Sequence, residues 1–224
     1  SDNKYLEIYN PTADTVDLAG YAYPNTNNGA DSIGNYDWWN TFDEGAVIAP
    51  GDVYVIAHGS ADSTILAQAD ETHDFLSNGD DGYALAFGTE SSYVVLDWLG
   101  NFDADPGSGW AVAGVSNGTQ EHTLVRKLSV TQGNSDWTAS AGTSAEDSEW
   151  IVLDQDDWTN LGSHSALVSG NPTAQLISLP EGWSIFSTYM MPLDLDLASV
   201  LDPIYDVVAI AKDFEGSAYL PEYN

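Results

Sequence analysis

The chain has 224 residues, and 35 acidic residues stand against 4 basic ones, which gives a formal net charge of −31 at pH 7. This charge argues against nucleic acid and against an anionic membrane surface as partners, because such a protein repels their negative groups. Cysteine is absent, which excludes disulfides and thiolate metal sites, whereas 43% hydrophobic residues with 8 tryptophans suffice for a buried core.

The excess of acidic residues has two possible explanations. It can serve calcium binding, or it can provide the hydrated surface that keeps a protein in solution in salt water. No apolar run is long enough to cross a bilayer. The opening Ser1-Asp2-Asn3 is not a signal peptide, so we expect a processed or trimmed piece of a longer chain.

The first predicted elements lie within residues 4–23. Tyr5, Glu7 and Tyr9 alternate with apolar residues, which is the period-two pattern of a half-buried strand. Proline follows at position 11 and ends that strand. Two further short strands are predicted over 15–18 and 21–23, so the chain begins as an all-β protein.

A polar, glycine-rich loop over 25–35 precedes the aromatic run Tyr36-Asp37-Trp38-Trp39. Adjacent residues of a strand point to opposite faces, so we expect one tryptophan in the core and the other outside. An exposed Trp38 or Trp39 would be a ligand-binding platform for carbohydrate, since sugar C–H faces pack on aromatic rings. The alternative is a loop that folds over the second ring.

The middle of the chain continues the pattern. Residues 46–49 and 53–57 are predicted strands, and Asp62 is placed to cap a short helix over 63–68. Two more strands, 83–87 and 93–99, form a predicted hairpin across 88–92. Strands over 122–127 and 149–153 complete a predicted β-sandwich. Within the first of these, Arg126 and Lys127 either recognise an anion or pair with neighbouring carboxylates.

Four motifs occur in the order YLEIYNPTADTVDLAGYAY, PGDVYVIA, LSNGDDGYALAFG and VLDWLG, and they resemble the lamin-tail domain. The resemblance covers residues 1–164 and implies an immunoglobulin-like β-sandwich. That family occurs in nuclear lamins and in many secreted bacterial proteins, where it often accompanies extracellular nucleases, phosphoesterases or surface proteins. Family members usually have one more strand before Lys4. Its absence implies an open sheet edge that can accept a strand from elsewhere.

The remaining residues divide into a linker over 165–174 and a partial, β-rich second module over 175–224. In the second module, strands are predicted over 175–179, 183–187 and 207–211, with a short helix over 196–201. LPEGWSIFSTYMMP and IAKDFEGSAYLPEYN resemble the opening of a module common in secreted and surface proteins of Bacteroidota, which often use the type IX secretion route. The module stops before it completes itself.

Three acidic segments offer the closely spaced oxygen ligands that calcium prefers, although none has the EF-hand spacing. The segment at 78–81 has an alternative reading as a hairpin turn. The predicted metal-site residues are Asp80, Asp81, Asp103, Asp105, Asp154, Asp156 and Asp157. His58 and His73 could also meet near Asp70 or Asp74, and capping or surface histidines are the ordinary alternative.

No nucleophile motif is present, and carboxylates are too abundant to discriminate a glycosidase. We therefore expect a non-enzymatic, extracellular or cell-surface module that binds other protein domains, copies of itself or surface polysaccharide. It would serve adhesion, or assembly through its open edge. The alternatives are an accessory domain of a secreted nuclease or phosphoesterase, and a carbohydrate-binding module.

Overall fold

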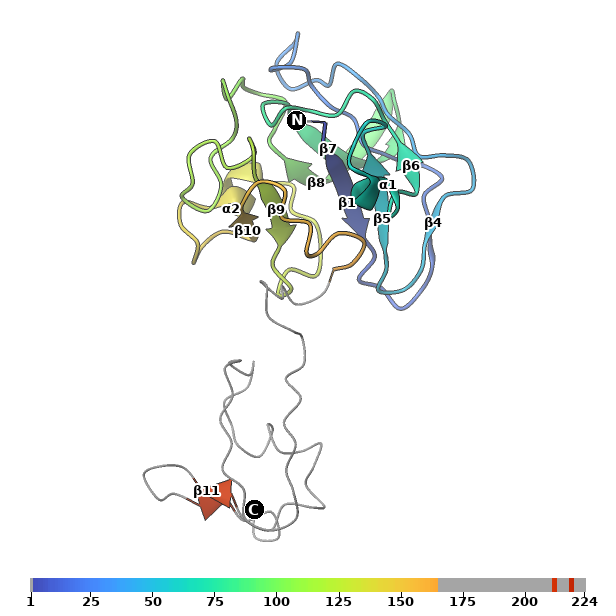
Figure 1. Cartoon of the computed structure of the whole chain (residues 1–224). Coiled ribbons are helices and arrows are strands. Elements are labelled where there is room, and N and C mark those ends of the chain that lie inside the picture. Colours follow the sequence, from blue (N-terminus) through green and yellow to red (C-terminus); the bar gives the residue numbers. More distant parts are fainter. Residues whose placement is uncertain (1, 165–210, 213–217, 220–224) are drawn as a thin grey trace. The chain divides into compact units, whose positions relative to one another are not determined.

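The computed structural model describes residues 2–164, 211–212 and 218–219 (Figure 1). The chain separates into two compact units, Ser1–Ser169 and Gly170–Asn224. In the second unit the described residues are two short antiparallel strands, β11 (Ala211–Lys212) and β12 (Ala218–Tyr219). The predicted linker over 165–174, and the strands and helix predicted within 175–210, lie outside the described residues.

The first unit is all-β, as predicted. Two three-stranded sheets form its centre. One sheet has the order β1 (Tyr5–Tyr9), β5 (Val53–Ala57), β6 (Glu71–Thr72). The other has the order β3 (Tyr21–Ala22), β7 (Tyr83–Thr89), β8 (Ser92–Leu99). Two-stranded pairs join β2 (Val16–Asp17) to β4 (Val47–Ile48) and β9 (Thr123–Arg126) to β10 (Trp150–Leu153). All of these pairings are antiparallel except that of β5 with β6.

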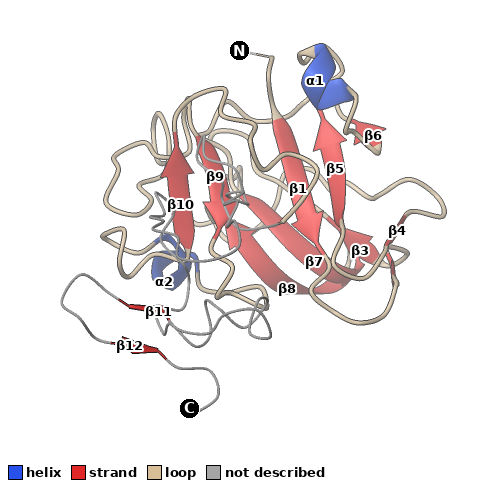
Figure 2. Ribbon diagram, turned by 60° about the horizontal axis from the view of Figure 1, so that its bottom comes forward, coloured by secondary structure: helices blue, strands red, loops and turns tan. Residues whose placement is uncertain are grey.

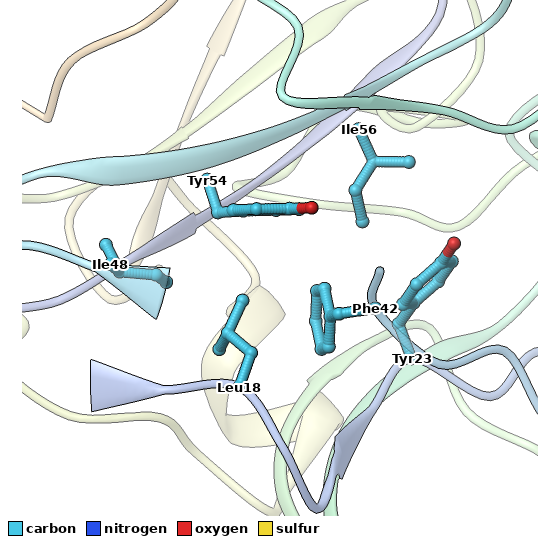
Figure 3. Packing of buried hydrophobic residues seen from close by; sticks show 6 residues of the cluster. All are labelled: Leu18, Tyr23, Phe42, Ile48, Tyr54 and Ile56. Carbon is cyan, nitrogen blue, oxygen red and sulfur yellow. The ribbon is translucent and has the colours of Figure 1, made fainter. Parts of the chain in front are cut away.

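The first core cluster lies between the β1-β5 sheet and β7. Its buried members are Leu18, Tyr23, Phe42, Ile48, Tyr54 and Ile56 (Figure 3). Leu6 and Ile8 of β1 and Leu85 of β7 pack against them. The two tyrosine hydroxyls of this cluster both donate to the carboxylate of Glu71, at 2.8 and 2.9 Å. The cluster therefore buries apolar rings without leaving their hydroxyl groups unsatisfied.

The second core cluster joins β9 and β10 to β8. Trp110, Val112, Trp137 and Ala141 are its buried members, and Trp98 and Leu99 of β8 pack against them together with residues of β9 and β10. Trp137 opens the short helix α2 (Trp137–Ala141), whose N-cap Asp136 accepts from the Ala139 backbone N–H at 3.1 Å. The β1-β5 and β9-β10 strands are thus two separate pieces that pack on the same β7–β8 hairpin.

The predicted strands over 5–9, 53–57, 83–87 and 93–99 are confirmed as β1, β5, β7 and β8. The strands predicted over 15–18, 21–23, 46–49, 122–127 and 149–153 are confirmed in shorter form as β2, β3, β4, β9 and β10. The helix α1 (Ser63–Leu66) also begins as predicted, with the Asp62 side chain accepting from the Thr64 N–H. The strand expected at 36–39 is wrong. That stretch pairs only through an isolated bridge between Asn25 and Trp38, because the chain curves around the Asp37 carboxylate.

Candidate functional site

The candidate site is an interval between β1 and β9. In Figure 2 these strands flank the interval and point in the same direction, with β5 beyond β1 and β10 beyond β9. Among the described residues, β1 is the last strand of its sheet and β9 pairs with β10 alone. Both strands therefore present an unpaired edge.

Hydrogen bonding identifies which residues of β1 face the open edge. His58 donates to the carbonyl of Lys4 at 2.9 Å, and Asn10 donates to the carbonyl of Asp52 at 3.0 Å. In an antiparallel pair, alternate residues bond the same partner, so even-numbered residues of β1 bond β5. Tyr5, Glu7 and Tyr9 consequently direct their backbone N–H and C=O groups away from β5. Within the described residues these groups have no hydrogen-bond partner.

The same reasoning applies to β9. Lys127 donates to the carbonyl of Glu149 at 2.8 Å, so odd-numbered residues bond β10. Leu124 and Arg126 point their backbone groups toward the open edge, and those groups too lack a partner in the described part of the chain. Two rows of unpaired donors and acceptors thus border the interval.

A cavity of about 800 Å³ occupies this interval, hereafter the slot. All residues of β1 and β9 line it, with parts of β7 and β8 and the closing segment over 158–164. Its inner side meets the core residues Leu6, Leu85 and Leu99. On the outer side, the ring of His164 lies 4.5 Å from that of Tyr9. A segment in the slot would therefore be covered on both faces.

One side chain of β1 reaches toward β9. Tyr5 of β1 makes a hydrogen-bonding interaction with the side chain of Thr123 on β9, so the strands lie within side-chain reach of each other. Neighbouring strands lie about 4.8 Å apart, so two strands that flank a third are separated by about 9.5 Å. A strand that paired with both β1 and β9 would require this separation.

The slot carries an unbalanced negative charge. Glu7 accepts from the Gly162 backbone N–H, and burial raises the pKa of this carboxyl to about 7. Glu121 and Asp156 also line the slot, and neither forms an ion pair with a described residue. Lys4 is held by the Leu76 carbonyl and the Asn78 amide oxygen at 3.1 and 2.8 Å.

The one arginine of the slot wall is already paired. Arg126 forms ion pairs with Asp97 of β8 and with Glu149, and its guanidinium lies 4.1 Å from the ring centre of Trp150. This confirms the predicted pairing with carboxylates for Arg126, whereas the Lys127 ammonium donates to the backbone carbonyl of Ala145 at 2.7 Å. The Nε of Arg126 is buried and has no hydrogen-bond partner within the described residues.

The two predicted platform residues differ in exposure. Trp38 is 62% exposed, whereas Trp39 packs with Tyr36 and Tyr93 at ring distances of 5.3 and 5.1 Å. This is the division into one outer and one inner ring that adjacent positions imply. Neither tryptophan lines the slot.

The predicted calcium ligands lie in two regions. Asp81 accepts from the Asn28 N–H, and the 103–105 segment packs against the same loop, where Gly34 donates to the Phe102 carbonyl. In the other region, the Asp156 carboxylate accepts from Asn3 and the Asp157 carboxylate accepts from Thr159. Asp80 is half-buried, whereas Asp103, Asp105 and Asp154 are exposed.

No group of three or more histidine, aspartate or glutamate side chains in the described part of the chain is gathered as a metal site. His58 and His73 do lie near each other, but the ring of His58 accepts from Ser60 N–H and Asp74 accepts from Gly59 N–H. Calcium binding remains a prediction.

The sequence reasoning missed Glu7 and the meeting of β1 with β9. A glutamate between two tyrosines reads as an ordinary solvent-facing residue. The segment that covers it, over 158–164, is far away in sequence. The only signal was the expected open edge near Lys4, which did not indicate a second edge opposite it.

Comparison with known proteins adds no relatives: no family model matches the chain, and no curated protein sequence matches it. Among the described residues, no helix has the length and apolar character that crossing a membrane requires.

Proposed function

We propose that this chain is an extracellular, non-catalytic binding module whose slot accepts an extended segment of another polypeptide. The observation that carries the proposal is the pair of unpaired edges, β1 and β9, on either side of one cavity. Strand addition at a sheet edge is a recurrent mode of peptide recognition, in which backbone hydrogen bonds supply affinity and alternate side chains supply specificity.

The geometry defines the orientation of the bound segment. Because β1 and β9 run in the same direction, one strand can be antiparallel to both (Figure 2). It would meet Tyr5, Glu7 and Tyr9 on one side and Leu124 and Arg126 on the other. The segment would join β1-β5 and β9-β10 into one continuous sheet over the β7–β8 hairpin.

The lining defines the chemistry of the segment. Residues that face inward meet Leu6, Leu85 and Leu99, so they should be apolar. Residues of the bound segment that face outward lie on the same side of the sheet as the Glu7 side chain. A lysine or arginine opposite Glu7 is therefore favoured, because it would form a cross-strand pair with the carboxylate. An acidic segment is disfavoured, since the slot already holds carboxylates without ion-pair partners among the described residues.

Charge also favours a different protein over a second copy. Each chain carries a net charge of −31, and bringing two such surfaces together costs electrostatic free energy. A partner that is neutral or basic avoids this cost and is attracted at low salt.

The test uses the whole chain and a synthetic peptide that alternates valine with threonine and carries lysine at the central outward position. Binding should protect the amides of Tyr5, Glu7, Tyr9, Leu124 and Arg126 from hydrogen exchange. Two matched peptides serve as controls, one with glutamate in place of lysine and one N-methylated along a single edge. We expect both to bind at least about tenfold more weakly.

Equal binding of all three peptides would contradict the proposal. The source of the natural segment is tested by measuring amide hydrogen exchange in the protein without peptide, at several protein concentrations. Fast exchange of these amides at every concentration supports an empty slot that awaits a partner. Protection that grows with concentration would mean that a second copy fills it, and concentration-independent protection would mean that the chain fills its own slot; either result overturns the proposal.

A further inference from the structure

A second candidate site surrounds Trp38, away from the slot. At 62% exposed, this indole is a large apolar ring presented to solvent. Its backbone is fixed on both sides, because Trp38 N–H donates to the Asn25 carbonyl and Asn25 N–H donates to the Trp38 carbonyl, both at 3.0 Å. Asn25 is itself buried. The ring is therefore mounted on an ordered base although it lies in a loop.

The neighbouring aromatic residues support the platform from behind. Tyr36 packs with Trp39, and its hydroxyl donates to the Glu90 carbonyl at 2.8 Å. Tyr93 of β8 contacts both rings, at 5.7 and 5.1 Å. This cluster ties the 36–39 stretch to the β7–β8 hairpin and leaves the next ring, Trp38, outside.

A hollow of about 530 Å³ lies beside Trp38, and polar residues make up most of its wall. Asp37 shapes the wall, since its carboxylate accepts from the backbone N–H groups of Asn27 and Asp31 at 2.9 and 3.0 Å. The side chains of Asp31, Ser32 and Asn35 also line the hollow. Within the described residues they form no hydrogen bond, so their donors and acceptors are available to a ligand.

This combination selects among ligand classes. A purely apolar partner would bury the hydroxyl, amide and carboxylate groups of the wall without satisfying them, which is costly. An anionic ligand would meet Asp31 on a chain of net charge −31. A neutral sugar satisfies both requirements, because its C–H face packs on the indole while its hydroxyl groups bond the polar wall.

We propose that Trp38 and the hollow lined by Asp31, Ser32 and Asn35 bind a neutral oligosaccharide. The indole face supplies the packing surface, and the three polar side chains set the orientation of the sugar ring. This site is independent of the slot, so either can fail without the other.

Affinity electrophoresis of the whole chain tests the proposal, with dextran, laminarin, xylan or galactomannan in the gel and alginate as an acidic comparison. At least one neutral polysaccharide should retard the native protein, and alginate should not. Trp38→Ala should weaken the retardation at least about tenfold at an unchanged melting temperature, because the side chain is exposed. Asn35→Ala, which keeps the indole, should weaken it less.

Phe75→Ala is the control, since Phe75 is an aromatic residue even more exposed than Trp38, at 82%, and does not line the hollow. It should leave retardation unchanged. The proposal is overturned if no neutral polysaccharide retards the native protein, if Trp38→Ala is retarded as strongly as the native chain, or if Phe75→Ala loses retardation to the same extent.

Discussion

At the scale of single residues, Glu7 is the most unusual group of the first unit. It lies in the middle of β1, at the wall of the slot, with its carboxylate under the closing segment. Burial raises the pKa of this carboxyl from 4.5 to about 7, and the Gly162 N–H opposes that rise only in part. The folded protein therefore holds the Glu7 proton more tightly than the unfolded chain does.

This difference gives a pH dependence with a defined sign. Because the unfolded chain loses the proton first, the contribution of Glu7 to stability is full below pH 4.5 and is lost as the pH rises to about 7. Glu7→Gln should abolish this loss. The change that it causes in the free energy of unfolding should be more stabilising at pH 8 than at pH 4, by on the order of 3 kcal/mol. Denaturant unfolding across this range measures it.

The control variant is Glu44→Gln, which alters an exposed carboxylate and should leave the pH profile almost unchanged. Parallel profiles for the native protein and Glu7→Gln would show that Glu7 titrates normally in the folded state.

At the scale of elements, the β7–β8 hairpin packs against both the β1-β5 and the β9-β10 strands and makes one close packing contact at its end. Gly100 follows β8 with φ +76°, and a Cβ there would lie 2.4 Å from the indole nitrogen of Trp110. That nitrogen donates to the Asp81 carbonyl at 3.1 Å. The end of the hairpin is thereby joined to the second core cluster.

Gly100→Ala should therefore lower the free energy of unfolding by more than the backbone cost alone. Gly107→Ala is the matched variant, since Gly107 has φ +83° and open space where its Cβ would be. It should cost only about 1 kcal/mol. Chemical denaturation of both variants isolates the packing contribution, and equal losses would mean that Trp110 moves aside without cost.

The elements that could be predicted from sequence are those whose residues alternate, or form a short apolar run bounded by turn residues. β1, β5, β7 and β8 satisfy this, and Asp62 marks the start of α1 by its capping chemistry. β6 has only two residues, and the Glu71 side chain that anchors it bonds Tyr23 and Tyr54 from distant positions. The helix α2 is likewise short, and Trp137 is fixed by contacts with Trp110 and Trp150.

The two candidate sites, the slot and the Trp38 site, also differ in whether they could be predicted from sequence. The sequence predicts the exposure of one tryptophan in the Trp38-Trp39 pair, although the alternation of a strand, on which the prediction rests, is not what produces it. The slot could not be predicted, because it arises where β1 and β9, far apart in sequence, come to face each other. The immunoglobulin-like β-sandwich and the lamin-tail resemblance remain predictions.

At the scale of the whole molecule, the net charge of −31 opposes compactness, because like charges repel more strongly in the folded chain than in the expanded one. Only Arg126 forms ion pairs within the described residues. The three core clusters, the third of which consists of Ala57, Ala61 and Ile65, and the backbone hydrogen bonds therefore supply the stability that offsets this repulsion.

Screening of these charges by salt should therefore stabilise the folded protein. We expect the melting temperature to rise by several degrees between about 10 and 500 mM sodium chloride. Calcium added at constant ionic strength separates the calcium prediction from screening: a further rise that a chelator reverses is expected if the aspartate loops bind the ion. A melting temperature that does not respond to sodium chloride would contradict the repulsion argument, and one that does not respond to calcium would contradict the site.

The arrangement of β1 and β9 also determines how a bound segment would respond to force. A strand seated between them is held along its length on both sides, so tension along the strand loads all of its hydrogen bonds at once. Tension across the sheet would instead open those bonds in succession. Release under pulling is governed by an unfolding rate rather than by affinity alone. A polypeptide anchored in this way would resist tension along the strand more strongly than tension across the sheet.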